Sequence, residues 1–120
     1  FISSKLKVKA LMLPKVKTPD EITFIDDLLC DCNLDTDLHV IMETNQALES
    51  IYDIALSSKR IAALFFGGVD MAADLRCENT WENLLFARSK ICKTSSVDRS
   101  KLDKKLLLAS FFGFSINISS

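Results

Sequence analysis

Three short apolar runs alternate along the chain with segments of helical periodicity, and this alternation constrains the fold more than any other feature. The runs VKALMLPK, LHVIME and RIAALFF occupy residues 8–15, 38–43 and 60–66. Each run is mainly apolar rather than alternating, which is typical of strands that are buried on both faces of a parallel sheet. The order of the elements therefore predicts an α/β fold whose parallel strands are joined by right-handed helical crossovers.

The segments between these runs carry helix signals. Helices are expected between the runs, over about residues 19–30 and 44–58, and after the last run, over about residues 80–93. Thr18 is a candidate N-cap for the first helix, with Pro19 at the first helical position and Glu21 three residues after the cap. Thr80 is expected to cap the last helix, and the segment between the third strand and that helix is predicted to be a loop.

The end of the chain differs in composition from the rest. Residues 94–105 are polar and predict a link or a surface helix. The apolar stretch after them predicts a helix over 106–112 that leads into a strand over 114–118. We therefore divide the chain into a strand–helix region, residues 1–93, and a linker with a tail, residues 94–120.

Composition excludes several classes of protein. The 120 residues are 48% hydrophobic and carry a net charge of -1, so they can bury a core but offer no basic stripe for nucleic acid or an anionic membrane. The longest apolar tract has thirteen residues, whereas a membrane span needs about twenty. No secretory signal is visible, and four cysteines with one histidine predict reduced thiols rather than a zinc site. These features predict a cytoplasmic protein.

Charged residues stand where the predicted strands end. Lys15, Glu43 and Asp70 each follow one strand, and the two acids are 27 residues apart, about one strand–helix repeat. The carboxyl ends of parallel strands form the binding face of α/β folds, so the two carboxylates are expected to face one crevice and to suit Mg²⁺. From spacing alone, two solvated acids that cap the following helices are the preferred interpretation over a metal pair. Gly67 and Gly68 either present N–H groups to a substrate carboxylate or simply make a turn.

Four segments jointly resemble a known family. LPKVKTPDEI, IMETNQALESIYDIA, ALFFGGVDMAADL and LLFARSKI are similar, in order and spacing, to motifs of the HpcH/HpaI aldolase and citrate lyase beta-subunit family, over about residues 8–92. The resemblance implies a (β/α)₈ TIM barrel, of which 120 residues supply three to four strand–helix units, because a whole barrel takes about 250 residues. The start at Phe1 rather than at methionine also suggests a piece of a longer protein.

The resemblance also implies a chemistry. It makes Glu43 and Asp70 the ligands of Mg²⁺ or another divalent cation such as Mn²⁺. The metal would stabilise the enolate that forms when a carbon–carbon bond breaks in an oxo-acid or acyl-CoA substrate. Gly67, Gly68 and Val69 would supply backbone contacts to the substrate carboxylate. The expected activity is that of a carbon–carbon lyase or aldolase, and no residue is assigned as catalytic.

Other interpretations stay open beside this one. The family's substrate-binding arginine and early strands have no counterpart here, so the chain can instead be an inactive truncated member. An open parallel fragment exposes two strand edges and one sheet face, which favours self-association as a homo-oligomer or completion of a partner chain. Lys15 is interpreted as a cation at the pocket rim or a surface lysine, and Asp74 as an acid that orients the metal site or a solvated helix residue. A phosphate-binding regulatory domain ranks last, since no phosphate loop is present.

Overall fold

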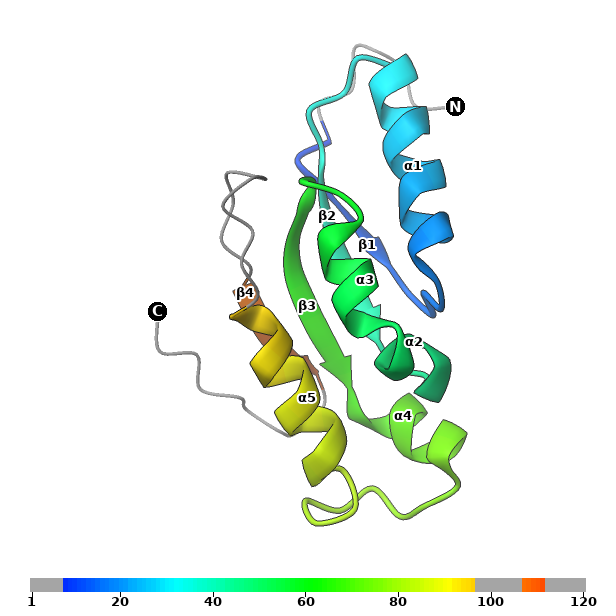
Figure 1. The fold of residues 1–120 in the computed structure, drawn as a ribbon, viewed down its shortest axis with the longest axis vertical. Helices are drawn as coiled ribbons and strands as arrows, with labels where there is room; N and C mark the ends of the chain where they lie inside the picture. The colour runs from blue at the N-terminus through cyan, green and yellow to red at the C-terminus, as the bar shows by residue number, and fades with distance from the viewer. Residues whose placement is uncertain (1–7, 97–106, 112–120) are drawn as a thin grey trace.

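The computed structural model describes residues 8–96 and 107–111, which form a parallel sheet with helices (Figure 1). The sheet has the order β1-β2-β3-β4. The strands are β1 (Ala10–Leu13), β2 (Asp37–Met42), β3 (Ile61–Gly67) and β4 (Leu107–Phe111). The helices are α1 (Pro19–Asp31), α2 (Asn45–Glu49), α3 (Ile51–Leu56), α4 (Gly68–Leu75) and α5 (Leu85–Ser95). The predicted α/β alternation with parallel strands is confirmed.

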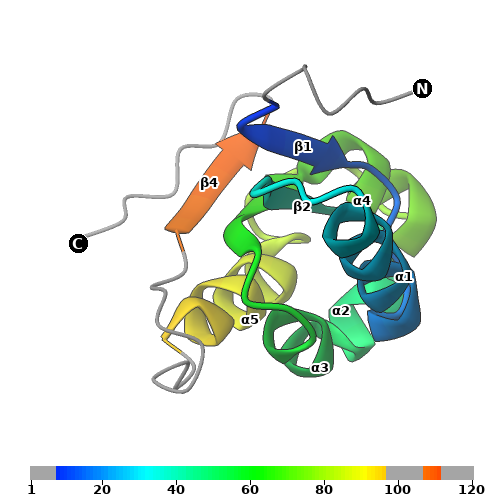
Figure 2. The ribbon, with the colours of Figure 1, turned by 90° about the horizontal axis from the view of Figure 1, so that it is seen from above.

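The two faces of the sheet differ in cover. Helices α1, α3 and α5 lie on the same side of the sheet (Figure 2). Along β2, Leu38, Val40 and Met42 are fully buried, whereas His39 and Ile41 between them are only half-buried. Because successive side chains of a strand point to opposite faces, the buried set faces the helices and the half-buried set faces away from them.

The core fills the space between the sheet and its helices. Its largest fully buried side chains come from strands, helices and the turn before α5: Phe66, Ile22, Leu38, Met42, Ile51, Ile54, Ile61, Leu64, Met71, Leu84 and Ile91. Each such side chain contributes about 1.5–3 kcal/mol by leaving water. Of the helices in residues 8–96, none has the length and apolar character needed to span a membrane.

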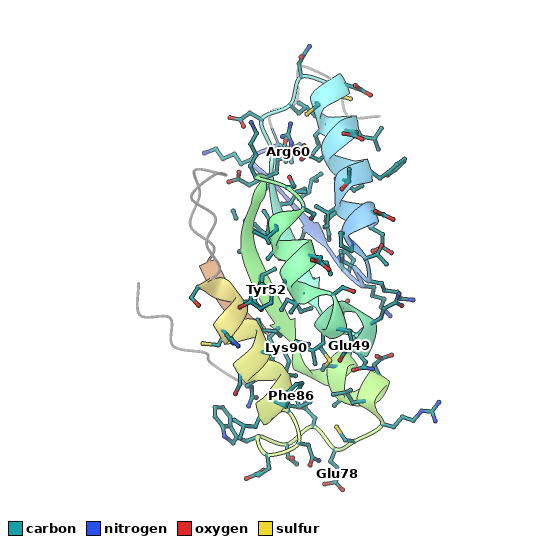
Figure 3. All side chains as sticks on the ribbon, in the orientation of Figure 1. Glu49, Tyr52, Arg60, Glu78, Phe86 and Lys90 are labelled. Carbon is teal, nitrogen blue, oxygen red and sulfur yellow. The ribbon has the colours of Figure 1, made fainter. Side chains whose placement is uncertain are left out.

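An ion pair ties α1 to the start of β3, at the end of the sheet where Arg60 is labelled in Figure 3. Arg60 Nε lies 2.6 Å from Asp26 Oδ1, and Arg60 Nη1 donates to the carbonyl oxygens of Leu34 and Thr36. Burial raises the pKa of Asp26, but hydrogen bonds from Ser58 and Arg60 outweigh it and hold the pKa below its usual value. The cluster joins α1, the residues before β2 and the start of β3 at the end of the sheet where the strands begin.

The start of α1 differs in detail from the predicted cap. Thr18 occupies the N-cap position with an extended backbone, but its side chain makes no capping hydrogen bond. The Glu21 carboxylate reaches one residue further back and accepts the N–H of Lys17 at 2.7 Å. The predicted boundary is therefore confirmed, whereas the predicted side-chain cap by Thr18 is not formed, and Glu21 instead ties the residue before the N-cap to the first turn.

The single helix predicted over residues 44–58 is wrong, because the segment forms α2 and α3 with a break at Ser50. Ser50 has φ -101° and ψ 12°, and its N–H is shared between the carbonyl oxygens of Gln46 and Ala47, both at 3.2 Å. Such shared bonds are common at helix ends. Thr44 caps α2 by accepting the N–H of Ala47 at 3.1 Å.

The loop predicted directly after the third strand is also wrong, because Gly68–Leu75 form α4. Gly67 has φ -94° and makes no left-handed turn, so the chain passes from β3 into the helix without a loop. Met71 and Ala72 are buried, which anchors this short helix on the core. Arg76 ends it in the left-handed region, with φ 57°.

Two further boundaries differ from the predictions. Thr80 accepts the N–H of Asn83 at 3.2 Å, but the residues after it form turns, and α5 begins only at Leu85. The helix predicted over 106–112 is wrong, because Leu107–Phe111 form β4, which pairs in parallel with β3. A continuous apolar run suits either element, and the open edge of β3 decides for the strand. The strand predicted over 114–118 lies outside the described residues.

Candidate functional site

Glu43 follows β2 directly and is almost fully buried, with 6% of its surface exposed. Its carboxylate is held from the neighbouring strand end, where the N–H of Lys15 donates to Glu43 Oε1 at 2.8 Å. Lys15 has φ 55°, a left-handed backbone that costs a non-glycine residue about 1–3 kcal/mol and is concentrated at functional sites. The turn after β1 is therefore shaped so that its backbone meets this one buried acid.

Asp70 lies in the first turn of α4, which begins where β3 ends, and its carboxyl group meets that of Glu43. Burial raises the pKa of Glu43, and a hydrogen bond to Asp70 together with its negative charge raises the pKa further. The backbone N–H and the ammonium group of Lys15 act in the opposite direction without cancelling the rise. Two acids from neighbouring strand ends thus share one small space.

A cavity of about 300 Å³ opens beside these acids. Its lining comes from the turn after β1, the residues after β2 and helix α4: Lys15, Glu43, Thr44, Asp70, Ala73 and Asp74. The structure therefore brings together Lys15, Glu43 and Asp70, which the sequence places at three separate strand ends. Asp74 makes a contact that the sequence does not reveal, since its Oδ2 accepts the N–H of Asn45 at 2.6 Å.

Gly67 has a part in this site that sequence reasoning missed. A Cβ added to Gly67 would lie 3.0 Å from Glu43 Cβ, 3.1 Å from Glu43 Oε2 and 3.3 Å from Ile41 Cγ2. The glycine leaves the space that the Glu43 side chain occupies. Gly68 is buried at the first position of α4, and Val69 after it is 51% exposed. No local sequence pattern reveals this close approach, because Gly67 ends β3 and Glu43 follows the neighbouring strand β2.

The donor set of this cavity suits a divalent cation. Within the described residues no group of three or more His, Cys, Asp or Glu side chains clusters as a metal site. The Glu43–Asp70 pair nevertheless supplies hard oxygen donors, and the raised pKa of Glu43 reflects burial and like-charge repulsion that a cation would relieve. Mg²⁺ binds through one or two carboxylates and keeps several waters, so two ligands are enough. The residues present fit such an ion.

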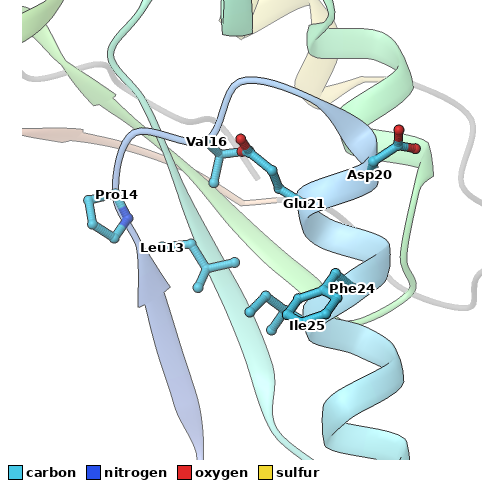
Figure 4. A pocket seen from close by; sticks show the side chains of 7 residues that line it. All are labelled: Leu13, Pro14, Val16, Asp20, Glu21, Phe24 and Ile25. Atoms are coloured by element: carbon cyan, nitrogen blue, oxygen red, sulfur yellow. The ribbon is translucent and has the colours of Figure 1, made fainter.

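A larger cavity of about 500 Å³ lies between the end of β1 and α1 (Figure 4). Its lining is mainly apolar: Leu13, Pro14, Val16, Asp20, Glu21, Phe24 and Ile25. The Glu21 carboxylate is already engaged by the N–H of Lys17. No pair of side chains converges there as Glu43 and Asp70 do, so the smaller cavity is the candidate site.

His39 lies outside both cavities. Its ring is tilted against that of Phe65, with 5.5 Å between the ring centroids. Arg88, at the other side of the core, places its guanidinium 4.1 Å from the ring centroid of Trp81 and 5.4 Å from that of Phe66. His39 thus packs within the sheet, and Arg88 packs α5 against the sheet and the turn before α5. Neither contact indicates a ligand-binding role for His39 or Arg88.

Comparisons with known proteins give a consistent picture. The family model of HpcH/HpaI aldolase/citrate lyase matches residues 2–104. RipC from Yersinia pestis is 31% identical with a TM-score of 0.72, over 87% of this chain and 46% of RipC. The protein CitE from Mycobacterium tuberculosis, in complex with magnesium and pyruvate, is 17% identical with a TM-score of 0.62, over 88% of this chain and 41% of CitE. No curated protein matches the sequence.

A third solved structure extends the same likeness. The HpcH/HpaI aldolase from Desulfitobacterium hafniense DCB-2 is 14% identical with a TM-score of 0.57, over 85% of this chain and 57% of that one. The chain thus spans about half the length of these proteins, and the predicted incomplete TIM-barrel architecture is confirmed. Because the family model covers most of the sequence, the chain belongs to the HpcH/HpaI aldolase/citrate lyase family.

Proposed function

We propose that Glu43 and Asp70 bind Mg²⁺, or another divalent cation such as Mn²⁺, in a carbon–carbon lyase of the citrate lyase beta type. The proposal rests on one observation, the convergence of a buried and an exposed carboxylate at the ends of β2 and β3, where the pKa of the buried acid is raised. Two acids that repel each other in one cavity are the arrangement that a cation stabilises.

Each residue of the cavity has a role in this proposal. The N–H of Lys15 fixes Glu43 Oε1, so that the carboxylate keeps one orientation while Oε2 points toward the Gly67 side. When bound, the metal supplies Lewis-acid polarisation of the substrate's carbonyl group. Gly68 and Val69 begin α4, so their backbone N–H groups have no helical partners. Together with the N–H of Gly67 at the N-cap position, they would bind the substrate carboxylate.

The relatives support the choice of substrate. CitE was solved with magnesium and pyruvate, and in a second structure with magnesium and acetoacetate, both of which are oxo-acids. We extend an oxo-acid or acyl-CoA substrate to this chain as part of the proposal. The cytoplasmic location and the homo-oligomeric state belong to the same proposal.

Magnesium binding tests the proposal directly. Titration calorimetry of the wild-type chain is expected to give one site. Glu43→Gln and Asp70→Asn are each expected to weaken its binding at least tenfold, because each removes one charged donor. Glu49→Gln is the matched control, since Glu49 is an exposed acid on the neighbouring helix α2 (Figure 3). Unchanged binding in both site variants refutes the assignment. Turnover of an oxo-acid or acyl-CoA by the wild type, lost in both variants, extends the test to catalysis.

A second function is favoured by the sheet face that none of the described helices covers (Figure 2). Met12 on β1 is 45% exposed, and Ile41 and Phe65 on the same face are half-buried. Within the described residues, β1 and β4 each pair with one neighbour, so both edges of the sheet offer free backbone groups. A non-catalytic protein that self-associates or completes a partner chain would cover this surface. Sedimentation distinguishes the two: a folded monomer with metal-dependent lyase activity excludes the second function.

A further inference from the structure

We infer that Asp74 is a positioning residue that ties helix α4 to the turn after β2 and thereby sets the separation of Glu43 and Asp70. This inference rests on the proposed function, because the separation matters only if the two carboxylates share a metal ion. It assigns to Asp74 a role through its neighbours and no contact with the metal.

The contact joins the two segments that carry the acids. Asp74 follows Asp70 by four residues in α4, so both side chains lie on one face of that helix and both line the cavity. Asp74 Oδ2 accepts the N–H of Asn45 at 2.6 Å, across 29 positions of sequence. Asn45 stands only two residues after Glu43, so this hydrogen bond connects the segment of one acid to the helix of the other.

Asn45 needs a partner from outside its own helix. It is the first residue of α2, and the first N–H groups of a helix have no partner within it. The Thr44 hydroxyl serves Ala47 at 3.1 Å, and the Asp74 carboxylate serves Asn45. The short turn is therefore held at three points, since Lys15 fixes the Glu43 carboxylate before it.

Metal binding is sensitive to such a tie. Ligands must be held within about 0.5 Å of their binding geometry by the groups around them. Glu43 and Asp70 come from different elements and repel each other. Met71 and Ala72 anchor α4 on the core, and the Asp74 hydrogen bond additionally holds the cavity side of α4 to the turn after β2. Removing outer partners of metal ligands typically costs 10–100-fold in affinity. Asp74 is exposed and water competes for its hydrogen bond, so we expect the lower end of this range.

Two substitutions separate the hydrogen bond from the charge. Asp74→Ala removes the acceptor and is expected to weaken magnesium binding about tenfold. Asp74→Asn removes the charge but keeps an acceptor oxygen, and is expected to stay within about threefold of the wild type. The second measurement is amide exchange at Asn45 in the absence of metal, which should accelerate in Asp74→Ala and be largely restored in Asp74→Asn. Asp53→Ala, which removes an exposed acid of α3, is expected to change neither quantity.

Each outcome decides between the alternatives. Equal weakening of magnesium binding in both Asp74 variants would show that charge alone matters and would overturn the positioning role. The positioning role would also be overturned if Asp74→Ala bound magnesium with wild-type affinity, or if amide exchange at Asn45 were unchanged in that variant. A wild-type protein that binds no magnesium refutes the proposed function itself, so the two failures are distinguishable. If Asp74→Ala fails to fold, binding by Asp74→Asn decides: a loss greater than threefold contradicts the inference.

Discussion

Replacing Gly67 with alanine tests whether this glycine leaves space for the proposed metal ligand. The added Cβ would lie 3.0 Å from Glu43 Cβ and 3.1 Å from Glu43 Oε2, whereas carbon atoms pack best at about 3.5–4.0 Å. Glu43 must therefore retreat by about 0.5 Å. It cannot retreat freely, because the N–H of Lys15 holds its Oε1 at 2.8 Å and the side chain is buried.

The stability change and the binding change are expected to differ in size. Overpacking costs about 1–3 kcal/mol, but alanine adopts the backbone of Gly67, with φ -94°, and regains about 0.4–1 kcal/mol from the unfolded state. The net loss in free energy of unfolding should then be about 0–2.5 kcal/mol. Magnesium binding should fall at least tenfold, or about 1.4 kcal/mol, because one of two ligands is displaced.

Urea unfolding without metal and titration calorimetry with magnesium measure the two effects. Gly67→Ser adds one more atom at the same point, and we expect it to exceed Gly67→Ala in both measurements. The reasoning is refuted if Gly67→Ala binds magnesium with wild-type affinity, because the Cβ would then fit without moving Glu43.

Two further predictions concern pH. The pKa of Glu43 is raised in the folded protein, so the folded state binds more protons and stability falls as pH rises above about 4.5. Metal-free Glu43→Gln should therefore unfold at a higher urea concentration than the wild type at pH 7, and an equal or lower midpoint would contradict this. The pKa of Asp26 is lowered, so its pairing with Arg60 stabilises the protein above about pH 3.8 and is lost as pH falls through the folded-state pKa. Asp26→Asn should lower the free energy of unfolding, measured by urea unfolding, by about 2 kcal/mol at pH 7 and by progressively less at acidic pH. A loss of stability that does not depend on pH would argue against the ion pair.

The sequence determined the elements whose signals are local. A mainly apolar run such as residues 60–66 forms a buried parallel strand wherever helices cover it, and β3 spans Ile61–Gly67, within one residue of the prediction at each end. The Pro19 signal marks the start of α1 correctly. The positions of Glu43 and Asp70 at neighbouring strand ends also follow from their spacing of one repeat, because parallel strands bring their carboxyl ends to one edge.

The tertiary structure alone decided elements without a strong local signal. Helix α4 has eight residues after a pair of glycines, and it is stable because Met71 and Ala72 reach the core formed by distant strands. Strand β4 is an apolar run that suits a helix equally well by pattern, and its pairing with β3 supplies the backbone hydrogen bonds that decide the matter.

The details of the candidate site likewise came from contacts between distant residues. The Lys15 N–H meets Glu43 across 28 positions, and Asp74 meets the N–H of Asn45 across 29. Gly67 matters because its missing side chain leaves room for Glu43. Hydrophobic periodicity reports which face of an element is buried, but it carries no information on which backbone N–H or which empty volume a carboxylate will meet. Those partners are set when the strands pair and the helices pack.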